Sequence, residues 1–186
     1  MKPVKIFVEG KSPVHSTDSG FLRDCIQHWF NKTISLPDNF KHIGGASEFK
    51  DMAPDIRLAI EKSYKVILII DADDNPAARK KEIEEFQARE NLKFPYFLFP
   101  DDTNGGEVEH LLTQIAIDKA RVKCYEDYER CVGVNLDIKD KVFAYIQAVT
   151  GDKEAAKDKN RNFLKGHFDL NDACLEPLKK FLTPYF

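Results

Sequence analysis

The chain has 186 residues, of which 42% are hydrophobic and 32% charged. This balance fits a folded domain with a sizeable core and excludes an intrinsically disordered chain. The formal net charge of −3 offers no general attraction for a polyanion, so any contact with nucleic acid must be local or carried by metal ions. No apolar run approaches the roughly 18 residues that a membrane span needs. The opening segment reaches Glu9 after a short apolar patch, so we expect neither a signal peptide nor a membrane partner.

The four cysteines, Cys25, Cys124, Cys131 and Cys174, are scattered and form no CxxC pair. This pattern predicts reduced thiols in a cytoplasmic protein and argues against a zinc site. Cys124 and Cys131 lie seven residues apart on one face of a predicted helix, and we expect both in the core.

Short apolar segments alternate with helical segments through the first two thirds of the chain. The predicted strands are residues 4–8, 39–43, 65–70 and 94–99, and the predicted helices are residues 20–32, 48–62, 76–90 and one that starts near Glu107. Residues 65–70 (KVILII) are the most hydrophobic strand, which we expect to be buried on both faces. Pro54 should interrupt or restart the second helix.

Strands joined by helices predict parallel βαβ units with right-handed crossovers. We therefore expect an α/β fold over residues 1–118, with a Rossmann-like, four-stranded, mainly parallel sheet flanked by helices. Residues 119–186 contain no convincing strand. They predict a helical C-terminal extension that packs on the same domain, with helices around 120–132, 138–150 and 172–182.

Three of the four predicted strands end in acidic residues, namely Glu9, Asp71 and the pair 101–102. Open parallel sheets bind ligands beyond the carboxyl ends of their strands, so these acids should meet at one edge. Asp71 and Asp73 are two residues apart and point to the same side of an extended backbone. Crowded carboxylates repel one another and raise a pKa unless a cation lies between them. Mg²⁺ (or Mn²⁺), which prefers oxygen ligands, is the cation that this pattern favours.

A structural interpretation of the same residues stays open. Asp and Asn after a strand are ordinary turn and N-cap residues, and Asp73 or Asp74 before Asn75-Pro76 fits a helix cap. Glu9 followed by Gly10 is equally typical of a turn.

Three segments together resemble the TOPRIM domain: KIFVEGKS (5–12), VILIIDADD (66–74) and FPDDTNGGEVEHLL (99–112). This domain is the metal-binding fold of topoisomerases, bacterial primases, overcoming-lysogenization-defect (OLD) nucleases and the small ribonucleases that mature 5S rRNA. The resemblance covers about residues 4–118 and is closest to small stand-alone TOPRIM-like and OLD-nuclease-like proteins.

The resemblance implies metal ligands at Glu9, Asp71 and Asp73. In OLD-type relatives a further glutamate opens the helix after the fourth strand, which implies Glu109 as a ligand, with Glu107 as the alternative. Relatives often carry an acid soon after the first glycine, whereas this chain has a longer polar loop. Either Asp18 takes that place or the second metal position is absent.

The activity that the resemblance implies is phosphoryl transfer on nucleic-acid phosphodiesters, as in a small nuclease. Metal held by Asp71 and Asp73 would neutralise the phosphate, and Glu9 is placed as a general acid or base. Lys11 is either a phosphate contact or a solvated loop lysine. Lys165 corresponds to a late lysine of OLD-type relatives.

The segment around Lys165 has several basic residues: Lys157, Lys159, Arg161 and Lys165. It is either a local contact for a phosphate backbone or a solvated face.

Three other functions compete with a nuclease. A non-catalytic metal- or nucleotide-binding regulatory or partner module of the same fold fits the acidic charge and the missing basic stripe. A nucleotide-sugar transferase also uses Asp-x-Asp after an apolar strand, but the chain is short for that class. Phosphoaspartyl chemistry ranks last, because it expects its Asp-x-Asp at the first strand, and here the pair follows the third.

Overall fold

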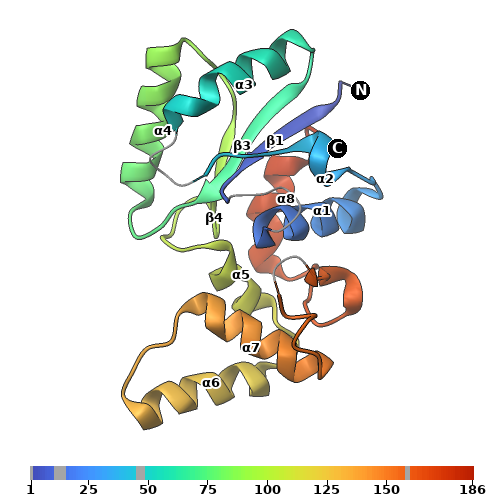
Figure 1. Cartoon of the computed structure of the whole chain (residues 1–186), viewed down its shortest axis with the longest axis vertical. Helices are drawn as coiled ribbons and strands as arrows, with labels where there is room; N and C mark the ends of the chain where they lie inside the picture. Colours follow the sequence, from blue (N-terminus) through green and yellow to red (C-terminus); the bar gives the residue numbers. More distant parts are fainter. Residues whose placement is uncertain (1, 11–15, 45–48, 158–159) are drawn as a thin grey trace.

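The computed structural model describes residues 2–10, 16–44, 49–157 and 160–186 and shows an α/β fold (Figure 1). One four-stranded sheet has the order β2-β1-β3-β4, and every neighbouring pair of strands is parallel. The strands are β1 (Val4–Val8), β2 (Phe40–His42), β3 (Lys65–Asp71) and β4 (Tyr96–Phe99). The expected four-stranded parallel sheet is confirmed, and each predicted strand lies within two residues of the observed bounds.

Helices connect the strands and make up most of the chain after β4. They are α1 (Thr17–Phe30), α2 (Leu36–Asn39), α3 (Phe49–Glu61), α4 (Pro76–Glu90), α5 (Val108–Ile115), α6 (Lys119–Val132), α7 (Ile138–Thr150), the 3₁₀ helices η3 (Phe163–Lys165) and η4 (Ala173–Leu175), and α8 (Glu176–Leu182). The expected break at Pro54 is wrong, because α3 continues through it. Pro54 lies near the start of α3, where a missing N–H removes one hydrogen bond of the first turns and leaves the rest of the helix intact.

The central strand β3 separates two hydrophobic cores. Ile67 and Ile69 pack with α1, α5 and α8 on one face, whereas Val66, Leu68 and Ile70 pack with α3 and α4 on the other. Figure 1 shows these helices on opposite sides of the sheet. Burial on both faces explains why this strand reads as an uninterrupted apolar run, as the sequence predicts.

Helices α6 and α7 form a hairpin at one end of the molecule (Figure 1). Val142, Tyr145 and Ile146 of α7 join the core beside α1 and α5, but α6 has no buried residue. The prediction that Cys124 and Cys131 belong to the core is therefore wrong, since both are exposed. Val122 and Tyr125 of α6 are partly buried against the core, and the face of α6 that carries Cys124 and Cys131 is left exposed. Within the described ranges, no helix is both long and apolar enough to cross a membrane.

The alternation of β3 between two cores gives a stability prediction. Ile67 is fully buried, so Ile67→Ala should lower the free energy of unfolding by about 2–5 kcal/mol through lost burial and the cavity that it leaves. Ile60→Ala is the matched control, because Ile60 is 44% exposed and its truncation should cost less than about 1 kcal/mol. Urea unfolding followed by circular dichroism measures both, and equal losses would contradict this placement of β3.

Candidate functional site

The acidic residues meet where the chain reverses its direction of winding across the sheet. From β1 the chain moves outward to β2, then returns to β3 on the other side of β1. The crevice between two such strands is where open α/β sheets bind ligands. Val8 pairs with Ile69 in this ladder, so Glu9 follows the end of β1 close to Asp71, the last residue of β3.

The backbone on either side of Asp71 fixes its carboxylate. Asp71 is buried, and its Oδ1 accepts a hydrogen bond from the Val108 N–H at 3.0 Å. The loop after β4 comes against the loop after β3, since the Gly106 N–H donates to the Asp73 carbonyl at 2.6 Å. A Cβ on Gly105 would lie 2.7 Å from that same carbonyl oxygen. The two glycines before α5 therefore permit a close approach of two backbones, which brings α5 to Asp71.

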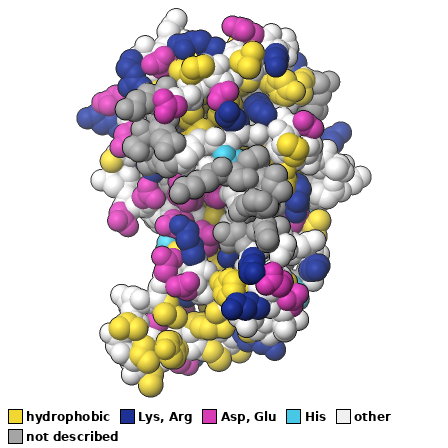
Figure 2. All heavy atoms as spheres, in the orientation of Figure 1, with side chains coloured by type: hydrophobic (Ala, Val, Ile, Leu, Met, Phe, Trp, Pro, Cys, Tyr) yellow, Lys and Arg dark blue, Asp and Glu magenta, His cyan; other side chains and the backbone are white. Residues whose placement is uncertain are grey.

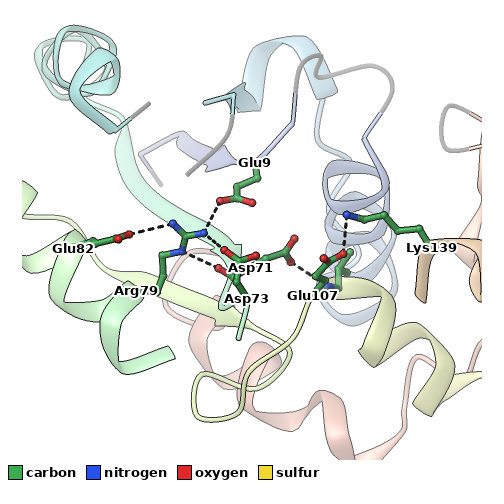
Figure 3. A network of polar contacts seen from close by, with 8 residues as sticks. Glu9, Asp71, Asp73, Arg79, Glu82, Glu107 and Lys139 are labelled. Carbon is green, nitrogen blue, oxygen red and sulfur yellow. Dashed lines mark hydrogen bonds and ion pairs between the residues drawn. The ribbon is translucent and has the colours of Figure 1, made fainter. Parts of the chain in front are cut away.

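A buried arginine lies among the carboxylates. The Arg79 side chain is 5% exposed, and Figure 3 shows its guanidinium group between Glu9, Asp73 and Glu82. Its Nη2 contacts an Asp73 oxygen and Glu9 Oε1, the latter at 3.4 Å. Its Nη1 donates to Glu82 at 3.2 Å and its Nε to the Asp71 carbonyl at 3.3 Å. The positive charge that the sequence requires between these acids is supplied, in this structure, by the chain itself.

The position of Arg79 in the sequence indicates that it lies near the acids, but the many charged residues around it make this hard to recognise. The segment PAARKKEIEEFQARE (76–90) reads as a solvated, charged helix, and most of α4 is indeed exposed. However, α4 begins directly after the Asp-x-Asp loop, so residues of its first turn lie beside the carboxyl ends of the strands. An arginine in that turn is therefore a candidate partner for the acids. Ile83, four residues further on, is buried, which places Arg79 on the inward side of the helix.

Burial and mutual repulsion raise the pKa values of the acids. Burial raises the pKa of Glu9 to about 7, although the nearby Arg79 charge opposes this. The pKa of Asp71 is well above its usual range, because burial is reinforced by the negative charges of Asp18, Glu9 and Glu109. At least one raised carboxylate pKa was expected of acids crowded together at this edge.

Asp18 belongs to the same electrostatic cluster. It lies at the start of α1 and accepts a hydrogen bond from Ser16 Oγ at 2.7 Å. Burial raises its pKa, and its charge in turn raises the pKa values of Glu9, Asp71 and Glu109. Asp18 is thus near enough to the other acids to influence their pKa values, and whether it takes the place of the missing acid after Gly10 stays a prediction.

The two glutamates of the loop and first turn of α5 have different surroundings. Glu109 is 3% exposed, and burial and the Asp18 charge raise its pKa to about 7 against the opposing charge of Arg161, 3.7 Å away. Glu107 is the N-cap of α5, in a reciprocal capping box with His110, and pairs with Lys139 at 2.7 Å. Glu107 thus stabilises the start of α5, whereas Glu109 lies near Asp71 and takes no part in the helix cap.

The other acids expected at this edge stabilise turns. Asp101 accepts hydrogen bonds from both Thr103 and Asn104, which outweigh the effect of burial and lower its pKa to about 2. Asp102 accepts from the Leu98 N–H and pairs with Lys80 at 3.4 Å. The cap alternative for the Asp-x-Asp loop is wrong as stated, because Asn75 caps α4, through the Ala78 N–H.

Among the basic residues expected to contact phosphate, Arg161 pairs with Glu109 of this site, and Lys157 pairs with Glu154. Lys11 lies outside the described residues, as does Lys159 of the basic segment. Lys165 ends η3 and is exposed, with no ion pair to the acid cluster within the described part of the chain. Arg161 is 6% exposed and donates to Thr17 and the Ala156 carbonyl. It therefore anchors the C-terminal segment on α1 and α5, and the expectation of a solvated face is wrong for this residue.

The donor chemistry of the cluster suits a divalent cation, because Mg²⁺ and Mn²⁺ prefer carboxylate oxygens. Across the described residues, no three His, Cys, Asp or Glu side chains stand close enough to hold one ion. Asp73 is turned to Arg79, and its backbone φ of 50° fixes the loop from which it projects. The residues therefore fit a cation if Asp73 or Glu9 leaves Arg79 and turns towards Asp71.

Comparison with known proteins identifies no relative: no family model, curated protein or solved structure matches the chain.

The raised pKa of Glu9 predicts how stability depends on pH. The folded protein holds the Glu9 proton up to about pH 7, whereas the unfolded chain releases it near its ordinary value of about 4.3. Stability from this group is therefore present at low pH and is lost as pH rises from about 4.5 to 7. Glu9→Gln keeps a neutral group throughout. The wild type should lose about 3 kcal/mol relative to this variant between pH 4.5 and 7.5, since one pKa unit corresponds to about 1.4 kcal/mol.

Urea unfolding in metal-free buffer at several pH values measures this difference. Glu126→Gln, a change of the same kind at an exposed position of α6, is the control and should follow the wild type at every pH. A constant gap between the wild type and Glu9→Gln would show that Glu9 ionises in its ordinary range.

Proposed function

We propose that the protein is a Mg²⁺- or Mn²⁺-dependent, TOPRIM-like phosphoryl-transfer protein that acts on nucleic-acid phosphodiesters, in the manner of a small nuclease. The observation that carries the proposal is the group of acids at the switch point of a parallel sheet, in which Asp71 lies near Glu9 and Glu109, and Asp73 shares Arg79 with Glu9. The sheet and the order of the acids along the chain are those that the TOPRIM resemblance implies.

Each residue of the cluster has a distinct task in this proposal. Asp71 and Asp73 hold the cation, with Glu109 as a further ligand. The bound cation would neutralise the phosphate and stabilise charge that develops on it. Glu9 moves a proton at the attacking or leaving oxygen, for which a carboxyl group with a pKa of about 7 is well suited at neutral pH. Val108, through its N–H, keeps the Asp71 carboxylate in one orientation.

A non-catalytic metal- or nucleotide-binding module is the second candidate, and two observations favour it. Arg79 already balances the acids of the cluster. On the face shown in Figure 2, the described Lys and Arg side chains are interspersed with Asp and Glu and form no continuous basic strip. Such a surface offers little electrostatic attraction for a phosphate backbone. Binding of metal without cleavage of any nucleic acid would favour this candidate.

Cation binding is the first prediction of the proposed function. Calorimetric titration of the wild type with Mn²⁺ should show one saturable event that Asp71→Asn abolishes, because the substitution removes a charged ligand. Asp74→Asn is the matched control, since Asp74 is an exposed neighbour on the same loop, and it should bind like the wild type. Equal loss in both variants would assign binding to the general charge of the loop.

Cleavage is the second prediction. With Mn²⁺ present, the wild type should cut labelled single-stranded or duplex DNA or RNA. Asp71→Asn should lower the rate on the order of 10²-fold or more, as for the loss of a group that stabilises transition-state charge. Asp74→Asn should retain wild-type activity. A rate equal in wild type and Asp71→Asn would assign the cleavage to a contaminant and refute catalysis at this cluster.

A further inference from the structure

Arg79 reaches the acid cluster with only one end of its guanidinium group. Nη2 contacts Glu9 and Asp73, the two carboxylates that project from the ends of β1 and β3. Nη1 points away from these acids to Glu82, and Nε donates to the Asp71 carbonyl. Nε and Nη1 thus anchor the guanidinium group, while Nη2 lies between the Glu9 and Asp73 carboxylates (Figure 3).

The geometry points to a competition, and we propose that Nη2 of Arg79 occupies the place of the divalent cation, so that arginine and metal exclude each other from Glu9 and Asp73. This inference rests on the proposed cation site. It adds a regulatory residue that neither the sequence pattern nor the resemblance assigns.

Three physical arguments support an exchange of partners. Carboxylate oxygens that accept hydrogen bonds from a guanidinium must turn away from it before they can ligate a metal. A divalent cation and the Arg79 charge also repel each other at such short range in a partly buried site. Finally, Glu82 and the Asp71 carbonyl retain the guanidinium after Nη2 is displaced, so the exchange leaves no buried charge without a partner.

Arg79 has opposite effects on the two states of the site. In the metal-free protein it lowers the repulsion among the acids, because its Nη2 lies against both Glu9 and Asp73. In the metal-bound protein it is an additional positive charge beside the ion. It therefore stabilises the metal-free state at the expense of metal affinity, and it sets the cation concentration at which the site fills.

The experiment compares Mn²⁺ affinity by calorimetry in the wild type, Arg79→Gln, Arg79→Lys and Arg89→Gln. Arg79→Gln removes the charge and should tighten Mn²⁺ binding at least tenfold. Arg79→Lys keeps the charge and should stay within about threefold of the wild type. Arg89→Gln removes an exposed arginine at the far end of the same helix and should leave affinity unchanged.

Thermal unfolding with and without Mn²⁺ gives a second measurement. Metal-free Arg79→Gln should unfold at a lower temperature than the wild type, and saturating Mn²⁺ should raise its Tm by more than it raises that of the wild type. A residue that only maintained the fold would give the opposite result, since a disturbed site binds metal less well.

The outcomes separate this inference from the proposed function. Wild-type binding with equal or weaker affinity in Arg79→Gln overturns the competition and leaves the proposed site standing. Saturable binding in neither protein overturns the competition and the proposed site together. Tighter binding in Arg79→Gln, without cleavage of nucleic acid by any of the proteins, supports the competition and refutes the proposed catalysis.

Discussion

The interaction between the Arg79 guanidinium and the carboxylates around it is the constraint on which the polar edge of the sheet depends. Parallel strands bring their carboxyl ends together, and in this chain two neighbouring strands end in Glu9 and Asp71. Charges buried at such distances repel strongly unless a cation or a proton intervenes. Arg79 provides the positive charge. Because the pKa values of Glu9 and Asp71 are raised, these acids also retain their protons to a higher pH than usual. Both solutions are reversible, which is compatible with the proposed exchange of Arg79 for a metal ion.

The hydrophobic core fixes the position of the polar edge of the sheet. β3 is buried on both faces up to its last residue, so the strand itself shields Asp71 from solvent. The loop before α5 closes over it, and the absence of a side chain at Gly105 permits that approach. The backbone N–H of Val108 then satisfies one oxygen of the carboxylate. Rigid apolar packing thus fixes the position of the acid, and a few hydrogen bonds fix its orientation.

The sheet and its acids were predictable from the sequence because both are local patterns. An apolar run with turn residues marks a strand, and Glu9 and Asp71 follow directly from where two strands end. The cationic partners were not predictable in the same way. Arg161 reaches Glu109 from the C-terminal segment, and Lys139 reaches Glu107 from α7, through tertiary contacts that no local pattern encodes. Cys124 was misplaced for a similar reason, because an apolar spacing on α6 does not show whether anything covers that face.

The placement of the basic residues limits how a polyanion approaches the site. Arg79 and Arg161 are buried against acids, and Lys139 is paired with Glu107, so each of these charges is already committed within the protein. None of these three positive charges is therefore available to attract a phosphate group. In the proposed function, a divalent cation held by these acids would offset their negative charge, and phosphate oxygens would be its further ligands. Under that proposal, cation binding and phosphate binding would be two parts of one equilibrium, in which the metal binds before the substrate or together with it.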